Sequence, residues 1–153
     1  MRSIAFELLR RVFEDDAYAN LLLPKLLAEA NVDSRDAGFI QELSFGTLRN
    51  KLFYEKVIAV ASSRDIASID SNALTVLLLG AHQLLGMRVP VHASINESVN
   101  LAKAKASKSV VGFVNAVLRR ISEKSRQQWV EIVTQGAETA EEKLSIEHSH
   151  PLW

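Results

Sequence analysis

The sequence of 153 residues contains no cysteine, only three prolines and only six glycines. Without cysteine, these residues hold no disulfide, no cysteine-ligated zinc and no cysteine nucleophile. The glycines are scattered and form neither a G-x-G-x-x-G nor a Walker pattern, so no phosphate-binding loop is predicted. We therefore expect no catalytic residues and no enzymatic activity in this chain.

Long apolar runs are also missing. The most apolar segment, Ala73–Leu85, is shorter than the roughly 20 residues of a membrane span, and it contains His82 and Gln83. We interpret it as the buried central helix of a core and expect no membrane partner. The absence of disulfides and of a signal-peptide pattern favours the cytoplasm. His148 and His150 are two residues apart without a third ligand nearby in the sequence, so no metal site is predicted.

Apolar residues recur with the helical period, and no segment alternates as a strand would. A single helix over the whole predicted range Arg35–Ser62 is improbable in a small domain, so we expect a break between Gly46 and Lys51. A glutamate-rich helix is predicted after Gly136, to about Glu147. The sequence thus predicts an all-α fold, a compact orthogonal helical bundle. Its predicted helical ranges are Arg2–Glu14, Asn20–Ala30, Arg35–Ser62, Asn72–Leu85, Ala93–Ser107, Ser109–Lys124 and Gln127–Gln135.

Helix ends are marked by polar residues that favour N-cap positions. Asp33 or Ser34 is expected to cap the third helical range, and Asp70 or Ser71 the fourth. Pro24 is expected in the first turn of the second helix, where its missing N–H costs nothing.

Charge is distributed unevenly, although the formal net charge is zero. Residues 101–126 contain seven basic side chains and one acidic side chain, whereas residues 127–153 contain five glutamates and one lysine. A zero net charge argues against nucleic-acid binding, but a basic segment can still contact a polyanion. A well-solvated basic helix surface is the commoner explanation, and it remains open.

Helical projection places the polar residues of the two basic helices. In the predicted helix Ser109–Lys124, Arg119 points away from the apolar face. Asn115 lies at the border of that face, where a structural hydrogen bond is expected. Arginines on a rigid helix, beside a helix that carries lysines and amides, suit contact with phosphates. We expect no exposed aromatic platform for bases, so any RNA would be read through phosphates and shape.

Several segments together resemble one known family. RSIAFELLRRV, GTLRN, LTVLLLGAHQLLGMRVPVHASINESVNLAK and GFVNAVLRRI resemble the NusB-like RNA-binding fold. The version most similar stands at the N-terminus of cytosine-5 rRNA methyltransferases of the RsmB/Sun (Fmu) type. The resemblance covers roughly residues 2–124 and implies a NusB-like RNA-binding domain over residues 1–125. It also implies a helical linker over residues 126–153 that leads toward an absent methyltransferase domain.

The last residues, SHPLW, resemble the segment that opens the catalytic part of these methyltransferases. We therefore expect a fragment of a longer enzyme. The resemblance implies that the S-adenosylmethionine site and the catalytic cysteines lie downstream, so that this chain itself holds no cofactor.

RNA contacts in NusB relatives come largely from an arginine-rich first helix, and Arg2, Arg10 and Arg11 match it. Glu7 and Glu14 stand three or four residues from Arg10 and Arg11, so pairing within the helix is an alternative for these two arginines. By charge alone, cations elsewhere rank at least as high. These further RNA-binding candidates are Arg49, Lys103, Lys105, Arg119 and Arg120.

Three functions remain in view at this point. The first is an accessory domain that binds rRNA and positions it for a catalytic methyltransferase domain in cis. The second is a free-standing transcription antitermination factor of the NusB type, which binds RNA with a ribosomal-protein partner. The third is a helical protein-interaction scaffold that does not bind RNA. The resemblance also implies a possible homodimer, as in some NusB relatives.

Overall fold

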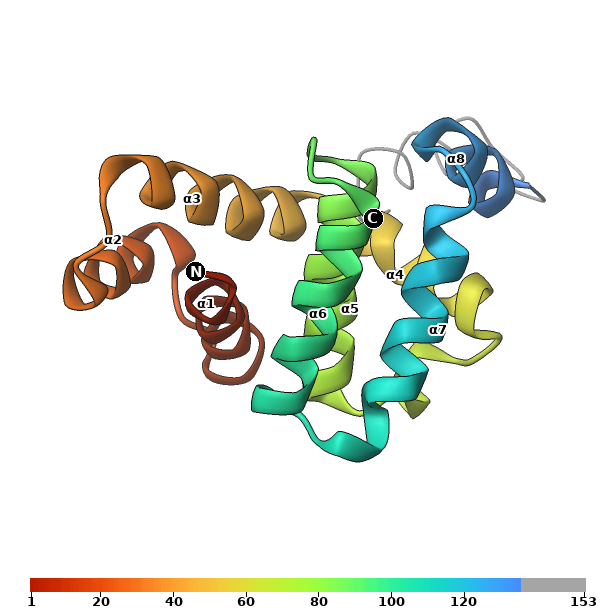
Figure 1. Cartoon of the computed structure of the whole chain (residues 1–153), viewed down its shortest axis with the longest axis horizontal. Helices are drawn as coiled ribbons and strands as arrows, with labels where there is room; N and C mark the ends of the chain where they lie inside the picture. The colour runs from red at the N-terminus through yellow and green to blue at the C-terminus, as the bar shows by residue number, and fades with distance from the viewer. Residues whose placement is uncertain (136–153) are drawn as a thin grey trace.

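The structure is a computed structural model that describes residues 1–135. The predicted glutamate-rich helix, His148, His150 and the SHPLW segment lie outside the described residues. Within residues 1–135 every regular element is helical, which confirms the all-α prediction. The helices (Figure 1) are α1 (Arg2–Asp15), α2 (Ala19–Ala30), α3 (Ser34–Arg49), α4 (Lys51–Ser62), α5 (Ser71–Leu85), α6 (Val91–Lys105), α7 (Val111–Ser122) and α8 (Arg126–Thr134), with 3-10 turns η1 (Ile66–Ser68) and η2 (Lys108–Val110).

Side-chain caps set the starts of three helices. The Asp33 carboxylate accepts a hydrogen bond from the Asp36 amide at 2.8 Å, and Asp70 accepts one from the Ala73 amide at 3.0 Å. Both caps were among the residues expected from the sequence. Ser125 begins α8 with a reciprocal capping box that includes Gln128.

The long predicted range Arg35–Ser62 is broken at Asn50, within the interval expected. The Asn50 side chain donates a hydrogen bond to the Gly46 carbonyl at 2.8 Å, and its backbone amide donates to the same oxygen at 3.1 Å. These bonds close the end of α3, and α4 begins at the next residue in a new direction.

The position expected for Pro24 was wrong. Helix α2 begins at Ala19 because the amides of Leu21 and Leu22 already donate to the Tyr18 carbonyl, at 3.1 and 2.9 Å. Pro24 therefore lies in the second turn of α2, where a regular helix would use the N–H that proline lacks. It is exposed to solvent there.

Helix α5 occupies the centre of the bundle. It packs against α1, α3, α4, α6 and α7, and ten of its fifteen residues are buried, as its apolar sequence predicts. Figure 1 shows α1, α2 and α3 on one side of α5 and α6, with α4, α7 and α8 on the other. A smaller apolar cluster around Leu8, Leu23 and Ile40 joins α1, α2 and α3. No described helix is long and apolar enough to cross a membrane.

Helix α8 packs its apolar side chains against this bundle, and two of its side chains also form hydrogen bonds to it. Trp129 is 3 % exposed, and its indole Nε1 donates to the Ile121 carbonyl at 2.9 Å. Arg126 donates to Asn50 Oδ1 at 2.9 Å and to Tyr54 Oη at 3.4 Å. The start of α8 is thereby fixed to the break between α3 and α4.

His82 lies in the core with both ring nitrogens engaged. Its Nε2 is hydrogen-bonded to Glu42 at 2.8 Å and its Nδ1 to Tyr54 Oη at 2.6 Å. Burial lowers the pKa of His82 and raises that of Tyr54 to about 12. A methyl group at Gly46 or Gly86 would collide with the imidazole, so both positions need glycine to leave room for this ring.

Candidate nucleic-acid interface

The eight cations predicted to bind RNA fall into two groups in the structure. We call Arg2, Arg10, Arg11 and Arg49 the α1–α3 arginines, after the helices that carry them. We call Lys103, Lys105, Arg119 and Arg120 the α6–α7 cations; they stand in the last turns of α6 and α7. The two groups differ in whether a carboxylate lies within ion-pair distance.

Two of the α1–α3 arginines share a carboxylate on their own helix. Glu7 accepts hydrogen bonds from Arg10 at 2.8 Å and from Arg11 at 2.9 Å, and Arg10 also donates to Glu14 at 2.9 Å. The Arg10 hydrogen bond is the main cause that lowers the pKa of Glu7 to about 2, and its bonds to Glu7 and Glu14 raise the pKa of Arg10. The intrahelical pairing that the spacing allowed is therefore present in the fold.

Arg2 and Arg49 have carboxylate neighbours on other parts of the chain. The Arg2 side chain is only 15 % exposed, lies 3.7 Å from Glu97 and donates to Gln83 at 2.7 Å. Burial lowers its pKa, although Glu97 acts in the opposite direction. Arg49 lies 3.7 Å from Glu42 but is largely exposed. Arg2 thus ties α1 to α5 and α6.

The α6–α7 cations have no carboxylate within ion-pair distance among residues 1–135, and all four are exposed. Arg119 Nε donates to Asn115 Oδ1 at 3.2 Å, and Arg120 Nη1 donates to the Ala61 carbonyl at 3.0 Å. The border position of Asn115 thus has a structural partner, which is Arg119 itself. Both guanidiniums are oriented by neutral oxygens and keep their full charge available to an anion.

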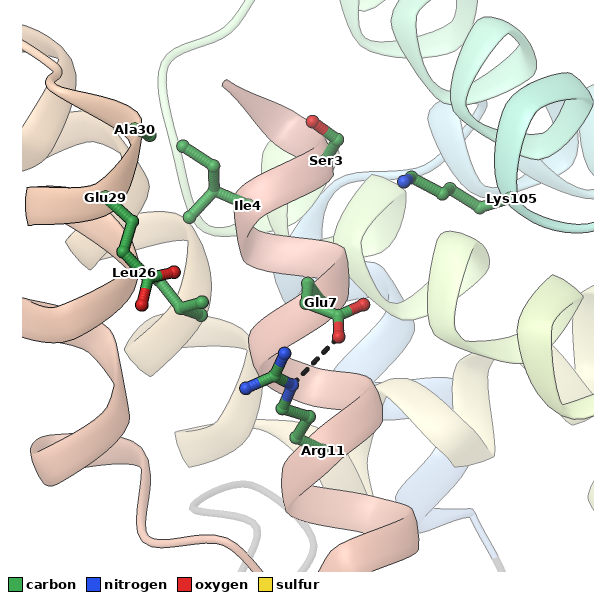
Figure 2. Close-up of a pocket in the computed structure, with 8 residues that line it drawn as sticks. All are labelled: Ser3, Ile4, Glu7, Arg11, Leu26, Glu29, Ala30 and Lys105. Carbon is green, nitrogen blue, oxygen red and sulfur yellow. Dashed lines mark hydrogen bonds and ion pairs between the residues drawn. The ribbon is translucent and has the colours of Figure 1, made fainter.

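A cleft brings members of the two groups together. It has a volume of about 380 Å³ and runs along α1 between α2 and the end of α6. Figure 2 shows Arg11 turned toward Glu7 on the same helix, while the Lys105 ammonium extends from α6 toward α1. Glu29 lines the opposite side. The cleft is therefore of mixed charge, and Lys105 is its cation without an acidic partner among the described residues.

Two further exposed cations adjoin the α6–α7 cations. Lys108 belongs to η2, which connects α6 to α7, and its place in the basic segment was a usable signal. Arg64 follows α4 in the chain, yet its guanidinium lies 4.9 Å from the centre of the Phe113 ring on α7. No sequence pattern pointed to Arg64, because only the packing of α4 against α7 brings it there.

Exposed positive charge is the main chemical feature of the ends of α6 and α7. Among the described residues, no three histidine or acidic side chains are grouped so that they could hold a metal ion. The α6–α7 cations, Arg64 and Lys108 are exposed on α6, η2, α7 and the residues after α4. Because α6 and α7 run antiparallel (Figure 1), the lysines at the end of α6 and the arginines at the end of α7 stand at opposite ends of this helix pair. Each end offers exposed positive charge that suits contact with a phosphate.

Comparison with known protein families gives one match over most of the described residues. The NusB family model matches residues 1–123, a range that contains all eight candidate cations. The match agrees with the all-helical structure.

Similar curated proteins carry methyltransferase names. A Mycobacterium tuberculosis protein named "Putative methyltransferase" is 40 % identical over 153 residues, which is 99 % of this chain and 34 % of that protein. The "Probable ribosomal RNA small subunit methyltransferase B" of Bacillus subtilis is 29 % identical, over 100 % of this chain and 33 % of its own length. The "Ribosomal RNA small subunit methyltransferase B" of Proteus mirabilis is 32 % identical, over 84 % and 29 %. The chain thus spans about a third of the length of these relatives.

Proposed function

The chain belongs to the NusB family, and from this premise we propose that residues 1–125 form an RNA-binding accessory domain of an rRNA methyltransferase. In this proposal the domain holds rRNA by its sugar–phosphate backbone and raises its concentration near a catalytic domain in cis. Residues 126–153 would form the linker to that domain. The observation that carries the proposal is the set of exposed α6–α7 cations without carboxylate partners in residues 1–135.

The methyl transfer itself is assigned to the longer protein. The relatives are about three times the length of this chain and are named as methyltransferases, which supports a catalytic domain outside these residues. We propose that it transfers a methyl group from S-adenosylmethionine to a cytosine C5 of rRNA in the cytoplasm. These names also favour the methyltransferase over a free-standing antitermination factor. A reading frame that continues past Trp153 into a glycine-rich loop and two cysteines would support this assignment, whereas a stop codon there would contradict it.

RNA binding by the chain is tested directly with a fragment of small-subunit rRNA at low salt. The informative variant is Lys103→Glu with Arg119→Glu, because both side chains are exposed and neither caps another helix. Its affinity should fall by about a hundredfold if each position contacts a phosphate. The matched control is Lys25→Glu with Lys56→Glu, which makes the same charge change at exposed positions on α2 and α4.

Circular dichroism of both variants establishes that the fold is intact. Equal losses of affinity in the two variants would reduce the effect to net charge and remove the α6–α7 surface from the proposal. No binding by the unmodified chain would favour the protein-interaction scaffold instead.

A further inference from the structure

Helix α2 has an apolar sequence although it lies at the edge of the bundle. The sequence ANLLLPKLLAEA contains only two charged residues, Lys25 and Glu29. A helix that is apolar on all sides is usually buried, and α5 follows this rule with ten buried residues. Helix α2 has one buried residue, Leu23, and Figure 1 shows it beyond α1 at the outer edge of the molecule. One side of α2 is therefore apolar and has no packing partner among residues 1–135.

The outer side of α2 carries exposed apolar residues. Its inner side packs against α1 and α3 around Leu23. Leu21, Pro24 and Ala28 are spaced by three and four residues, so they share one face, and all three are exposed. Tyr18 lies three residues before Leu21, at the N-cap of the helix. Tyr18 is 74 % and Leu21 70 % exposed, more than any other large hydrophobic residue of the described part. We call Tyr18, Leu21, Pro24 and Ala28 the outer α2 face.

Carboxylates stand at both ends of the outer α2 face. Asp15 and Asp16 lie at the junction of α1 and α2, and Glu29 lies in the last turn of α2. All three are exposed, and none has a basic partner within ion-pair distance in residues 1–135. These charges oppose the approach of a phosphate backbone. A complementary protein surface is apolar in its middle and basic at its ends.

A second copy of the chain does not supply such a surface. In a symmetric dimer, two outer α2 faces would pack against each other either parallel or antiparallel. Because both ends of the face are acidic, each arrangement brings carboxylates of one copy against carboxylates of the other. Like charges that face each other across an interface oppose association. The charges at its ends therefore favour a different partner with basic residues.

The continuation of this chain begins away from the outer α2 face. Helix α8, after which residues 136–153 follow, lies on the other side of α5 and α6 from α2 (Figure 1). A helix face with this spacing suits packing against a second helix, whose side chains form matching rows. We infer that the outer α2 face docks an amphipathic helix of another protein, with apolar residues along one face and lysines or arginines at both ends. This interaction goes beyond the proposed function, because it uses neither RNA nor the α6–α7 cations.

The test uses two labelled peptides of about 14 residues, long enough to cover α2 and cross-linked to hold the helix. Both have leucines along one face; one has lysines at both ends and the other has glutamates. Fluorescence anisotropy should show that the lysine peptide binds the unmodified chain about tenfold more tightly than the glutamate peptide. Leu21→Gln should weaken binding of the lysine peptide about tenfold. The matched control is Val91→Gln, an exposed apolar residue on α6, which should change it less than about twofold.

A further variant separates charge from apolar contact. Asp15→Asn with Glu29→Gln should reduce the advantage of the lysine peptide to about threefold or less, with circular dichroism as the check on folding.

Three results would overturn the inference. They are binding of neither peptide, equal binding of both peptides, and equal losses in Leu21→Gln and Val91→Gln. Sedimentation velocity covers the remaining occupant, since a dimer that Leu21→Gln dissociates would show that a second copy covers this face and would also overturn the inference. Leu21→Gln should leave affinity for the rRNA fragment within about twofold, so each of these failures leaves the proposed function intact.

Discussion

The α1–α3 arginines and the α6–α7 cations carry the same formal charge but present different electrostatic surfaces. Glu7 lies within 2.9 Å of both Arg10 and Arg11, and carboxylates also lie close to Arg2 and Arg49. Among the α6–α7 cations, Arg119 and Arg120 donate hydrogen bonds to neutral oxygens in residues 1–135, and Lys103 and Lys105 have no side-chain partner there. A phosphate at α1 must compete with carboxylates already paired to its arginines, whereas none of the α6–α7 cations has a carboxylate within ion-pair distance in residues 1–135.

This difference shows that the number of basic residues in a segment is a poor measure of the unpaired positive charge on its surface. Arg10 and Arg11 lie in a helix whose acidic residues recur at the same spacing, so their charge is largely used within the helix. Residues 101–126 contain seven basic residues and only one glutamate. Ion pairs within a helix are therefore limited there by the lack of acidic partners.

The largest expected effect is on RNA affinity. Replacing Lys103 and Arg119 by glutamine should lower affinity for an rRNA fragment about tenfold and reduce the slope of log affinity against log salt by about 1.5. The same change at Arg10 and Arg11 should leave both quantities nearly unchanged, because these charges are already paired. Fluorescence anisotropy titrations at several salt concentrations measure both. Equal losses in the two double variants would abolish the distinction between the groups.

A reversed order is expected for stability. Arg10→Gln with Arg11→Gln should lower the free energy of unfolding slightly but measurably at pH 7, since the pairs are partly exposed, whereas Lys103→Gln with Arg119→Gln should leave it almost unchanged. The pKa of Glu7 is lowered from 4.5 to about 2, so its contribution is complete above pH 4.5 and is lost as the pH falls toward 2. Urea unfolding across this range checks the prediction. A difference between parent and Arg10–Arg11 variant that stays constant down to pH 2 would contradict it.

The smallest expected effect is a gain in RNA affinity that would make Arg11 resemble the unpaired α6–α7 cations. Glu7→Gln removes the carboxylate shared by Arg10 and Arg11 and leaves Arg11 in the cleft that Lys105 also lines. RNA affinity at low salt should then rise about twofold, because Arg11 gains an unpaired charge beside an existing cation. Glu29→Gln is the matched control, since Glu29 lines the same cleft and has no ion pair with any described residue. An equal rise in both variants would assign the gain to net charge alone.

Much of the fold could be predicted because local signals decide it. Apolar periodicity predicted the helices, and Asp33 and Asp70 cap two of them as their positions suggested. The break near Asn50 followed from the improbable length of one helix. The early start of α2 could not be predicted, because it depends on the conformation of Tyr18, whose carbonyl accepts the first amides.

The candidate site was predictable only as a set of cations. Spacing allowed the pairing of Arg10 and Arg11 with Glu7, but the pairing of Arg2 with Glu97 joins residues far apart in the sequence. Arg64 was missed for the same reason, since its approach to Phe113 depends on how α4 packs against α7. The burial of His82 and Gln83, both 2 % exposed or less, was implied by their apolar surroundings, while their partners were not.

The attachment of α8 bears on where a protein chemist could cut this chain. The family match ends at residue 123, yet Trp129 fills a place in the core and Arg126 bonds to Asn50 and Tyr54. A protein shortened to the matched residues would expose the apolar surface beneath the indole and leave the Ile121 carbonyl without its donor. We therefore expect a stably folded version of this domain to retain α8, so that the first part of the proposed linker belongs to the fold of the domain.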